Sequence, residues 1–152
     1  MPVDQSVIGR KLPPSSMTVD AGRLRFFAQT IGETNPVFTD LDAAKAAGFT
    51  NLPVPPTFLF GIEFDNPDSF GWLAEMGVDL RRVLHGEQSF VYHSTAVAGD
   101  ELTSTPTIGN VYSKKGGALE FIEKTSTITR ADGELIAELK SVIVVRNPEV
   151  GQ

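Results

Sequence analysis

The sequence predicts an α+β fold in which a long antiparallel sheet curls around one buried helix. The first part of the chain has the apolar spacing of short amphipathic helices. From Val83 onward, β-branched and aromatic residues are separated by short turns, which is typical of an antiparallel meander. Between these parts, residues 57–64 are nearly all apolar, and we expect this helix to be buried on all sides under the sheet.

The first amphipathic helix is predicted within residues 20–31, where apolar residues recur at the i, i+3, i+4 and i+7 positions. We expect its amino-terminal cap among Ser15, Ser16 and Thr18, because their hydroxyl groups accept hydrogen bonds from free helical amides. The helix should end near Gly32.

A second short helix is predicted over residues 41–47. Thr39 or Asp40 is the expected cap, and Gly48 is the expected left-handed terminator. The sequence therefore predicts two helices before the apolar helix at residues 57–64.

The apolar helix should begin at Pro56, because the prolines before it exclude an earlier start and a proline suits the first turn. One or two further helical turns are expected from Ser69, capped by Asp68 and stopped at Gly77. The helical part of the chain is therefore expected to end at Gly77, before the first of the long strands.

Four strands make up the rest of the chain. They are expected at residues 83–97, 101–113, 118–130 and 135–146. Each is longer than the ~5–6 residues of an ordinary strand, and short turns join them, so consecutive strands should pair in antiparallel fashion. The two ends, residues 1–16 and 147–152, are expected to be loosely held.

Composition limits the kinds of function. At 152 residues we expect one domain over residues 1–152, short for a fully enclosed active site and therefore suited to a site shared between subunits. A net charge of −6 without a basic stripe argues against nucleic acid, and the lack of cysteine with only two histidines argues against a metal centre. The sequence shows no membrane-length apolar run and no secretory signal, so a soluble cytoplasmic protein is expected.

The segment GETNPVFTD, residues 32–40, is the first candidate for chemistry. As a plain connector, Asn35 and Pro36 would supply the turn while Phe38 packs into the core. As a functional loop, Glu33 would supply a carboxylate. The residues alone leave both interpretations open.

A second candidate is the run HGEQ, which begins at His85. An imidazole beside a flexible glycine and a carboxylate, Glu87, can change its charge near neutral pH. Alternatively, His85 is satisfied by backbone groups, Gly86 forms a β-bulge, and Glu87 simply faces outward.

Two long stretches resemble a known family. They are FAQTIGETNPVFTDLDAAKAAGFTNLPVPPTFLF and FVYHSTAVAGDELTSTPTI. Both are similar to segments of MaoC-like dehydratases and (R)-specific enoyl-CoA hydratases, and the His-Gly-Glu run is common in the N-terminal, fungal-synthase-like members of that family. The resemblance covers about residues 12–145. It implies a hotdog fold that dimerises edge to edge, as a homodimer or a heterodimer, with acyl-thioester sites at the interface.

The resemblance also implies a reaction and its residues. Family hydratases use an aspartate and, five residues later, a histidine to add water to, or remove it from, an acyl thioester held on coenzyme A or an acyl carrier, with no cofactor. Glu33 and Phe38 occupy these two positions here, so the histidine is replaced by a side chain without a proton to transfer. Asn35 and Pro36 still match the motif.

The remaining site residues follow from these points. Glu33 with His85 is the candidate catalytic pair, and Asn35, Phe38 and Glu87 are candidate substrate contacts. Pro56 and Thr57 begin the apolar helix, whose free amides and positive dipole end can hold a thioester oxygen.

Four functions remain open at this point. The chain is a hydratase/dehydratase subunit that needs a catalytic partner, an active homodimer using Glu33 and His85, or a binding or scaffold protein without turnover. A hotdog thioesterase, for which Glu63 is the only acid within the apolar segment, is the weakest option.

Overall fold

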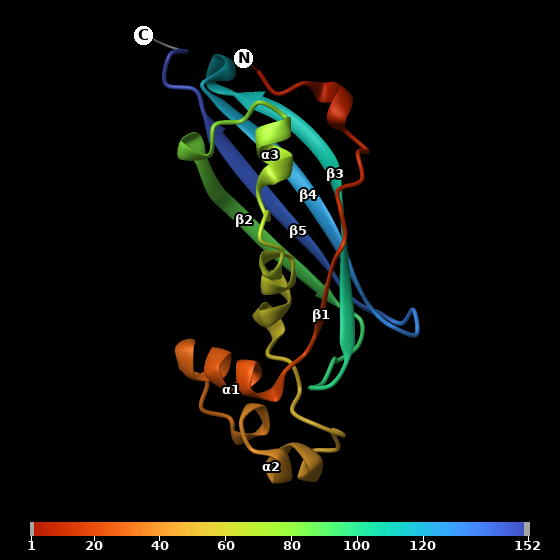
Figure 1. The fold of residues 1–152 in the computed structure, drawn as a ribbon. Helices are drawn as coiled ribbons and strands as arrows, with labels where there is room; N and C mark the ends of the chain where they lie inside the picture. The colour runs from red at the N-terminus through yellow and green to blue at the C-terminus, as the bar shows by residue number, and fades with distance from the viewer. Residues whose placement is uncertain (1, 151–152) are drawn as a thin grey trace.

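The computed structural model describes residues 2–150 and contains one five-stranded antiparallel sheet (Figure 1). The strand order is β1-β3-β4-β5-β2. The strands are β1 (Ser15–Thr18), β2 (Val83–Tyr92), β3 (Glu101–Lys114), β4 (Leu119–Arg130) and β5 (Leu135–Arg146). The expected α+β class is confirmed, with a sheet that curls around the central helix. The predicted meander is correct for β3, β4 and β5, which pair consecutively, and wrong for β2, which pairs with β5 and not with the following β3.

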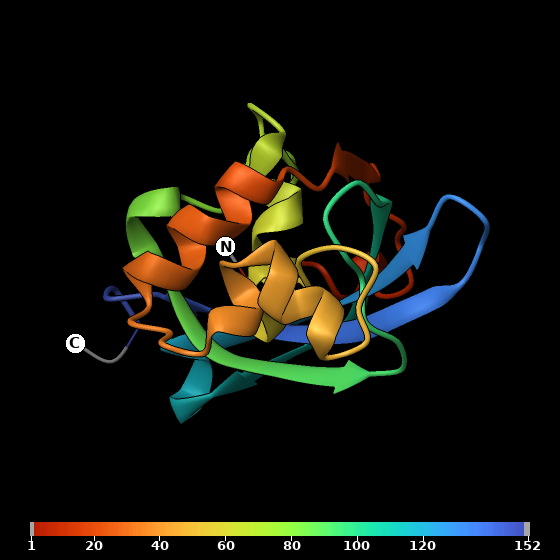
Figure 2. The ribbon, with the colours of Figure 1, turned by 90° about the horizontal axis from the view of Figure 1, so that it is seen from below.

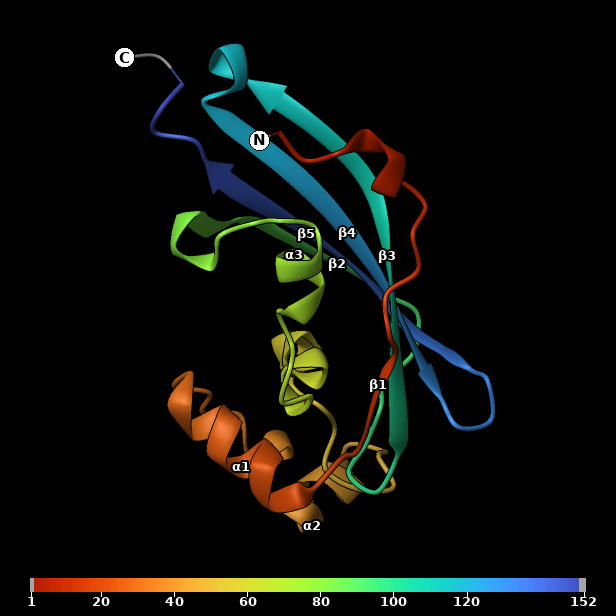
Figure 3. The ribbon, with the colours of Figure 1, turned by 45° about the horizontal axis from the view of Figure 1, so that its top comes forward.

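The helical segments lie on one face of the sheet (Figures 2 and 3). They are α1 (Ala21–Thr30), α2 (Leu41–Ala46), the ten-residue 3-10 helix η3 (Pro56–Asp65) and α3 (Gly71–Glu75). Short 3-10 turns complete the chain: η1 (Gln5–Val7), η2 (Pro36–Phe38), η4 (Leu80–Arg82) and η5 (Lys115–Gly117). Figure 3 shows η3 between the concave face of the sheet and α1.

Helix η3 is the central helix that the apolar segment predicts, and it begins at Pro56 as expected. Its buried residues, Phe58, Leu59 and Ile62, join the main hydrophobic core, and Phe58 meets Phe27 of α1 in an edge-to-face contact at 5.5 Å. The expectation of burial on all sides is wrong for this chain by itself, because Phe64 is exposed. The core covers one side of η3 and leaves another open.

The helix starts differ from the prediction in two places. Asp20, and none of the three earlier hydroxyl residues, caps α1 by accepting a hydrogen bond from the amide of Arg23 at 2.9 Å. Helix α3 begins at Gly71 without a side-chain cap, two residues later than Ser69. The prediction for α2 is confirmed, with Asp40 as its cap and Gly48 in the left-handed region.

The expected hydroxyl caps have another role, since Ser15–Thr18 form the edge strand β1 on β3. Strand β2 ends at Tyr92, five residues before the predicted end. The other three strands match the predicted ranges to within a residue.

The prediction of a loose amino-terminal end is wrong, because Val3 and Leu12 are buried. The buried carboxylate of Glu120 accepts hydrogen bonds from the amide of Val3 at 2.6 Å and from the side-chain nitrogen of Asn147 at 2.7 Å. One side chain thus ties together two segments from opposite ends of the sequence. The last two residues of the expected loose carboxyl end lie outside the described part of the chain.

The register of the sheet shifts at three places, two of them β-bulges at a glycine and the third between Ile128 and Thr129 in the pairing of β4 with β5. The register of β2 against β5 shifts between His85 and Glu87, and that of β3 against β4 shifts between Ile108 and Asn110. The bulge expected at Gly86 is therefore present, and it locally increases the twist of the edge strand. Within residues 2–150, no helix combines the length and apolarity needed to cross a bilayer.

Candidate functional site

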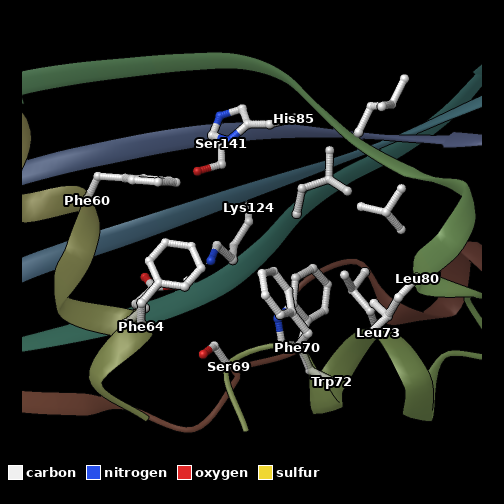
Figure 4. Close-up of a pocket in the computed structure, with 14 residues that line it drawn as sticks. Phe60, Phe64, Ser69, Phe70, Trp72, Leu73, Leu80, His85, Lys124 and Ser141 are labelled. Carbon is white, nitrogen blue, oxygen red and sulfur yellow. Dashed lines mark hydrogen bonds and ion pairs between the residues drawn. The ribbon is translucent and has the colours of Figure 1, made fainter. Parts of the chain in front are cut away.

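A cavity of about 350 Å³ lies between the carboxyl-terminal half of η3, helix α3 and the concave face of the sheet (Figure 4). Most of its wall is apolar, and the polar side chains come from η3, β2, β4, β5 and, with Ser69, the segment before α3. The lining residues that matter below are Phe60, Glu63, Phe64, Phe70, Trp72, His85, Lys124 and Ser141.

Glu63 of η3 and Lys124 of β4 form an ion pair at the base of this cavity. Glu63 Oε1 also accepts hydrogen bonds from the hydroxyl groups of Ser104 at 2.8 Å and Ser126 at 2.5 Å. The serines come from β3 and β4, so both carboxylate oxygens of Glu63 are bonded to the sheet. This cluster fixes the rotation of η3 against the sheet.

The cluster determines the protonation of Glu63. Burial by itself would raise the pKa of this carboxyl. The charge of Lys124 and the hydrogen bonds from Lys124, Ser126 and Ser104 together outweigh burial, so the pKa of Glu63 lies below its ordinary value. Glu63 is therefore ionised at neutral pH.

His85 lies on the same sheet wall of the cavity as Lys124, two strands away on β2 and just before the bulge. Its Nε2 lies 3.0 Å from the carbonyl oxygen of Glu87, and its ring packs against Phe60 with centroids 5.2 Å apart. A carbonyl oxygen only accepts, so in the neutral imidazole Nε2 carries the proton and Nδ1 is left as the acceptor. The bulge thus orients the ring with one basic nitrogen free.

The loop at residues 32–40 is ordered by its own side chains. The carboxylate of Glu33 accepts a hydrogen bond from the amide of Asn35 at 2.9 Å, and Asn35 Oδ1 accepts from the amide of Val37 at 3.1 Å. Asn35 thereby caps the short turn η2, in which Pro36 takes the first position. The retained Asn-Pro pair therefore has a direct structural role in shaping this loop.

A second, shallower hollow of about 310 Å³ lies beside this loop. Asn35, Phe38 and Pro56 line it together with residues from the extended segment before η3. It adjoins the amino-terminal end of η3, whereas the larger cavity adjoins the other end. These two concave regions therefore lie at different ends of one helix.

Comparison with known proteins identifies the family. The family described as "FAS1-like, dehydratase domain region" matches residues 6–139. A UPF0336 protein from Streptomyces avermitilis is 36% identical over 152 residues, which cover 99% of this chain and 100% of that protein. A solved structure called a MaoC-like dehydratase superposes with a TM-score of 0.82 at 22% identity, over 95% of this chain and 43% of that one. The chain belongs to the FAS1-like dehydratase domain family, and it has the fold of the MaoC-like structure.

A further solved structure has the same fold. It is the C-terminally truncated HadBC (3R-hydroxyacyl-ACP dehydratase) complex from Mycobacterium tuberculosis. The match has a TM-score of 0.75 and 24% identity, and covers 91% of this chain and 96% of the matched chain. At this identity the similarity establishes the hotdog fold.

The sequence-derived site residues of this MaoC-like chain fall into separate groups. Asn35, Phe38 and Pro56 share the smaller hollow, and Thr57 is exposed next to Pro56. The cavity under η3 contains His85, whose ring bonds the backbone of the exposed Glu87. Within residues 2–150, no hydrogen bond or ion pair joins Glu33 to His85.

The most polar part of the larger cavity was missed by the sequence reasoning. Lys124, Ser126 and Ile128 alternate along β4 with residues that face away, and Ile128 is fully buried. A lysine in phase with buried isoleucine is therefore a signal of an inward charge. Glu63, the acid within the apolar segment, is the second part of this signal, because it bonds both the lysine and a serine of β4.

Metal binding would need several ligating side chains that point at one place. Among residues 2–150, no three histidine, aspartate or glutamate side chains converge in a way that would hold a metal ion.

Proposed function

We propose that this chain is a subunit of an acyl-thioester hydratase/dehydratase, and that it binds 2-enoyl or 3-hydroxyacyl thioesters while a second hotdog chain supplies the aspartate–histidine pair. The observation that supports this proposal most is the arrangement of side chains in the loop at residues 32–40. Glu33 is bonded to the amide of Asn35, and Phe38 stands where the family resemblance requires an imidazole. The nearest chemical substitute, His85, lines a different cavity.

The partner would pair with the free edge of the sheet at β2. Within the described chain, β2 is hydrogen-bonded on one side only, to β5. Leu84, Val91 and Tyr92 of this strand are exposed, and an apolar edge strand is a ready template for pairing with another chain. The HadBC structure is named as a complex of two such proteins, which supports a second hotdog chain as the partner.

The thioester would lie near the amino-terminal end of η3. Thr57 is exposed there, and Pro55 provides no side-chain cap, so the first amides of the helix are available to a thioester oxygen. The substrate would arrive on coenzyme A or on an acyl carrier, and the reaction would need no cofactor.

The experiment is a hydration assay with crotonyl-CoA, using the purified chain alone and together with a candidate partner that carries Asp-x-Asn-Pro-x-His. We expect slow hydration by the chain alone and a large increase with the partner. Glu33→Gln and His85→Ala should leave the paired activity within about threefold, because neither group transfers the proton. Rapid hydration by the chain alone that both substitutions abolish would contradict the proposal.

That contradicting result would establish the second candidate, an active homodimer that uses Glu33 and His85. The free Nδ1 of His85 favours this candidate, because a general base must have an unbonded acceptor. Binding of acyl thioesters without turnover in either assay would instead identify a binding or scaffold protein.

A thioesterase is disfavoured by the state of Glu63. Both of its oxygens are engaged by Lys124, Ser104 and Ser126, so none is free to attack a thioester or activate water. Release of free thiol from crotonyl-CoA, measured in the same assay, would show this fourth option to be correct.

A further inference from the structure

The amino group of Lys124 has hydrogen-bonding capacity that the fold does not use. An ammonium group has three donors. Among residues 2–150, the only acceptor hydrogen-bonded to it is Glu63, and the centroid of the Trp72 ring lies 5.7 Å away. The side chain is 13% exposed and lines the cavity (Figure 4), so little bulk water reaches the remaining donors.

The ion pair determines which acceptor fits there. Glu63 needs no further donor, because Lys124, Ser104 and Ser126 satisfy it. An anionic group bonded to Lys124 would also approach the negative charge of Glu63 in a poorly solvated cavity. An uncharged oxygen gains the charge-assisted hydrogen bond without that repulsion.

The sheet wall beside the lysine offers acceptors, because Ser141 of β5 pairs in register with Lys124 of β4. Ser141 donates its proton to Gln88 Oε1 at 2.6 Å, so its oxygen keeps free lone pairs, and the Nδ1 of neutral His85 is also an acceptor. Figure 4 places His85 and Ser141 together on one side, with Lys124 between them and the aromatic rings of Phe64 and Trp72. A hydroxyl group in this space can accept from the lysine and donate to Ser141 or His85 on the same sheet wall.

We propose that this cavity binds an aliphatic chain that carries one uncharged oxygen, a hydroxyl or a ketone, and that Lys124 recognises this oxygen. The inference rests on the proposed function, because it names a substrate class for the same chain. Thr57 and Glu63 are about 12 Å apart at the ~2 Å rise per residue of a 3-10 helix. The recognised oxygen would therefore lie well along the acyl chain, away from a thioester bound at the start of η3.

Trp72 makes the proposal directly measurable, since it is the only tryptophan and lines the cavity. The probes are heptan-2-ol and 2-methylheptane, in which a methyl group replaces the hydroxyl, and binding is followed by tryptophan fluorescence. In the double variant Glu63→Gln, Lys124→Met, we expect affinity for the alcohol to fall about tenfold relative to affinity for the hydrocarbon. The double change avoids leaving a lone buried charge, and the introduced glutamine keeps an acceptor for the serines.

Two further variants serve as comparisons. Lys140→Met removes a lysine of β5 that pairs with Glu123 and does not line the cavity, and it should keep the wild-type ratio of the two affinities. Lys124→Arg retains donors at the same place and should keep most of the preference. A ratio in the double variant equal to that of the wild type would overturn the proposal, as would lysine-dependent binding of heptanoate that is tighter than binding of heptan-2-ol.

A measurement on the unaltered protein covers the case in which the variants do not fold. The lysine side-chain NMR signal of Lys124 should shift with heptan-2-ol and stay in place with 2-methylheptane, and equal shifts would overturn the proposal. These readouts need no turnover. A failed preference therefore removes this inference alone, whereas absent hydration with any partner removes the proposed function.

Discussion

Lys124 of β4 and Glu63 of η3 form an ion pair inside the fold, with 13% and 17% of their side chains exposed. Removing one partner leaves the other charge buried without compensation. We therefore expect Lys124→Met to lower the free energy of unfolding by about 3–5 kcal/mol, measured by urea denaturation at neutral pH. Lys140→Met, at the more exposed pair with Glu123, should cost less than about 1 kcal/mol. Equal losses of unfolding free energy in the two variants would show that the Glu63–Lys124 pair stabilises the fold no more than the exposed pair does.

The depressed pKa of Glu63 also predicts how stability depends on pH. A carboxyl group whose pKa is lower in the folded state stabilises the fold above its unfolded pKa, and this contribution is lost as the pH falls through the folded value. The ordinary value is 4.5, so the loss should occur below it. Urea midpoints measured from about pH 6 down to about pH 3 should fall more steeply for the wild type than for Glu63→Gln. Parallel curves would exclude a contribution from Glu63.

The two bulge glycines allow a matched test of the site geometry. A Cβ atom at Gly86 would lie 2.8 Å from Val144 Cγ2 and 3.2 Å from the carbonyl oxygen of Val142. We expect Gly86→Ala to destabilise the protein by about 1–3 kcal/mol and to alter ligand-induced changes in Trp72 fluorescence, because the bulge positions His85. At Gly109 the nearest atoms are 3.7 Å away, so Gly109→Ala should be much milder. A larger loss of stability in Gly109→Ala than in Gly86→Ala would show that the β2 bulge accommodates a Cβ atom without strain.

Glu33 allows its structural and chemical roles to be separated. Glu33→Gln keeps an oxygen that can accept from the amide of Asn35, so its stability should remain within about 0.5 kcal/mol of the wild type. Glu33→Ala removes that acceptor and should cost about 1 kcal/mol in thermal or urea unfolding. If Glu33→Gln instead abolishes hydration while the fold stays intact, the carboxylate takes part in the reaction.

The free edge of β2 predicts which surface controls assembly. Val91 is 55% exposed on this strand, and a lysine there places a charge in any pairing across the edge. We expect Val91→Lys to weaken self-association, or association with the partner, by at least about tenfold in sedimentation or calorimetry. Ile8 is 43% exposed near the opposite edge of the sheet, and Ile8→Lys should leave the affinity unchanged. Weakening by the Ile8 variant alone would place the interface at the other edge.

Most of the strands could be predicted because the residue patterns that define each strand lie close together in the sequence. Alternating residues and short turns mark β3, β4 and β5 to within a residue. Strand β1 lacks such a signal, since four residues from Ser15 to Thr18 acquire strand structure only by pairing with residues 101–104 of β3. Residues 93–97 have strand-forming composition but leave the sheet, where the amides of His93 and Ser94 both bond to the carbonyl of Ile136.

The candidate site could be predicted less completely than the fold. The Asn-Pro loop and the bulge at Gly86 have turn and bulge chemistry that a sequence displays directly. The Glu63–Lys124 pair joins residues 61 positions apart, and its existence depends on how η3 rotates against the sheet. Local sequence patterns do not determine that rotation. The cavity and the ion pair at its base could therefore be identified only from the tertiary structure.

The pairing of β2 with β5 alone has a consequence for how the protein matures on the ribosome. Strand β2 is synthesised about forty residues before β5, the one strand within residues 2–150 that pairs with it, so it must wait unpaired until β5 has emerged. During that interval an unpaired strand that carries Leu84, Val91 and Tyr92 is available to chaperones or to a neighbouring nascent chain. Co-translational encounter with a second hotdog chain could shield it, and genes translated side by side would favour that encounter.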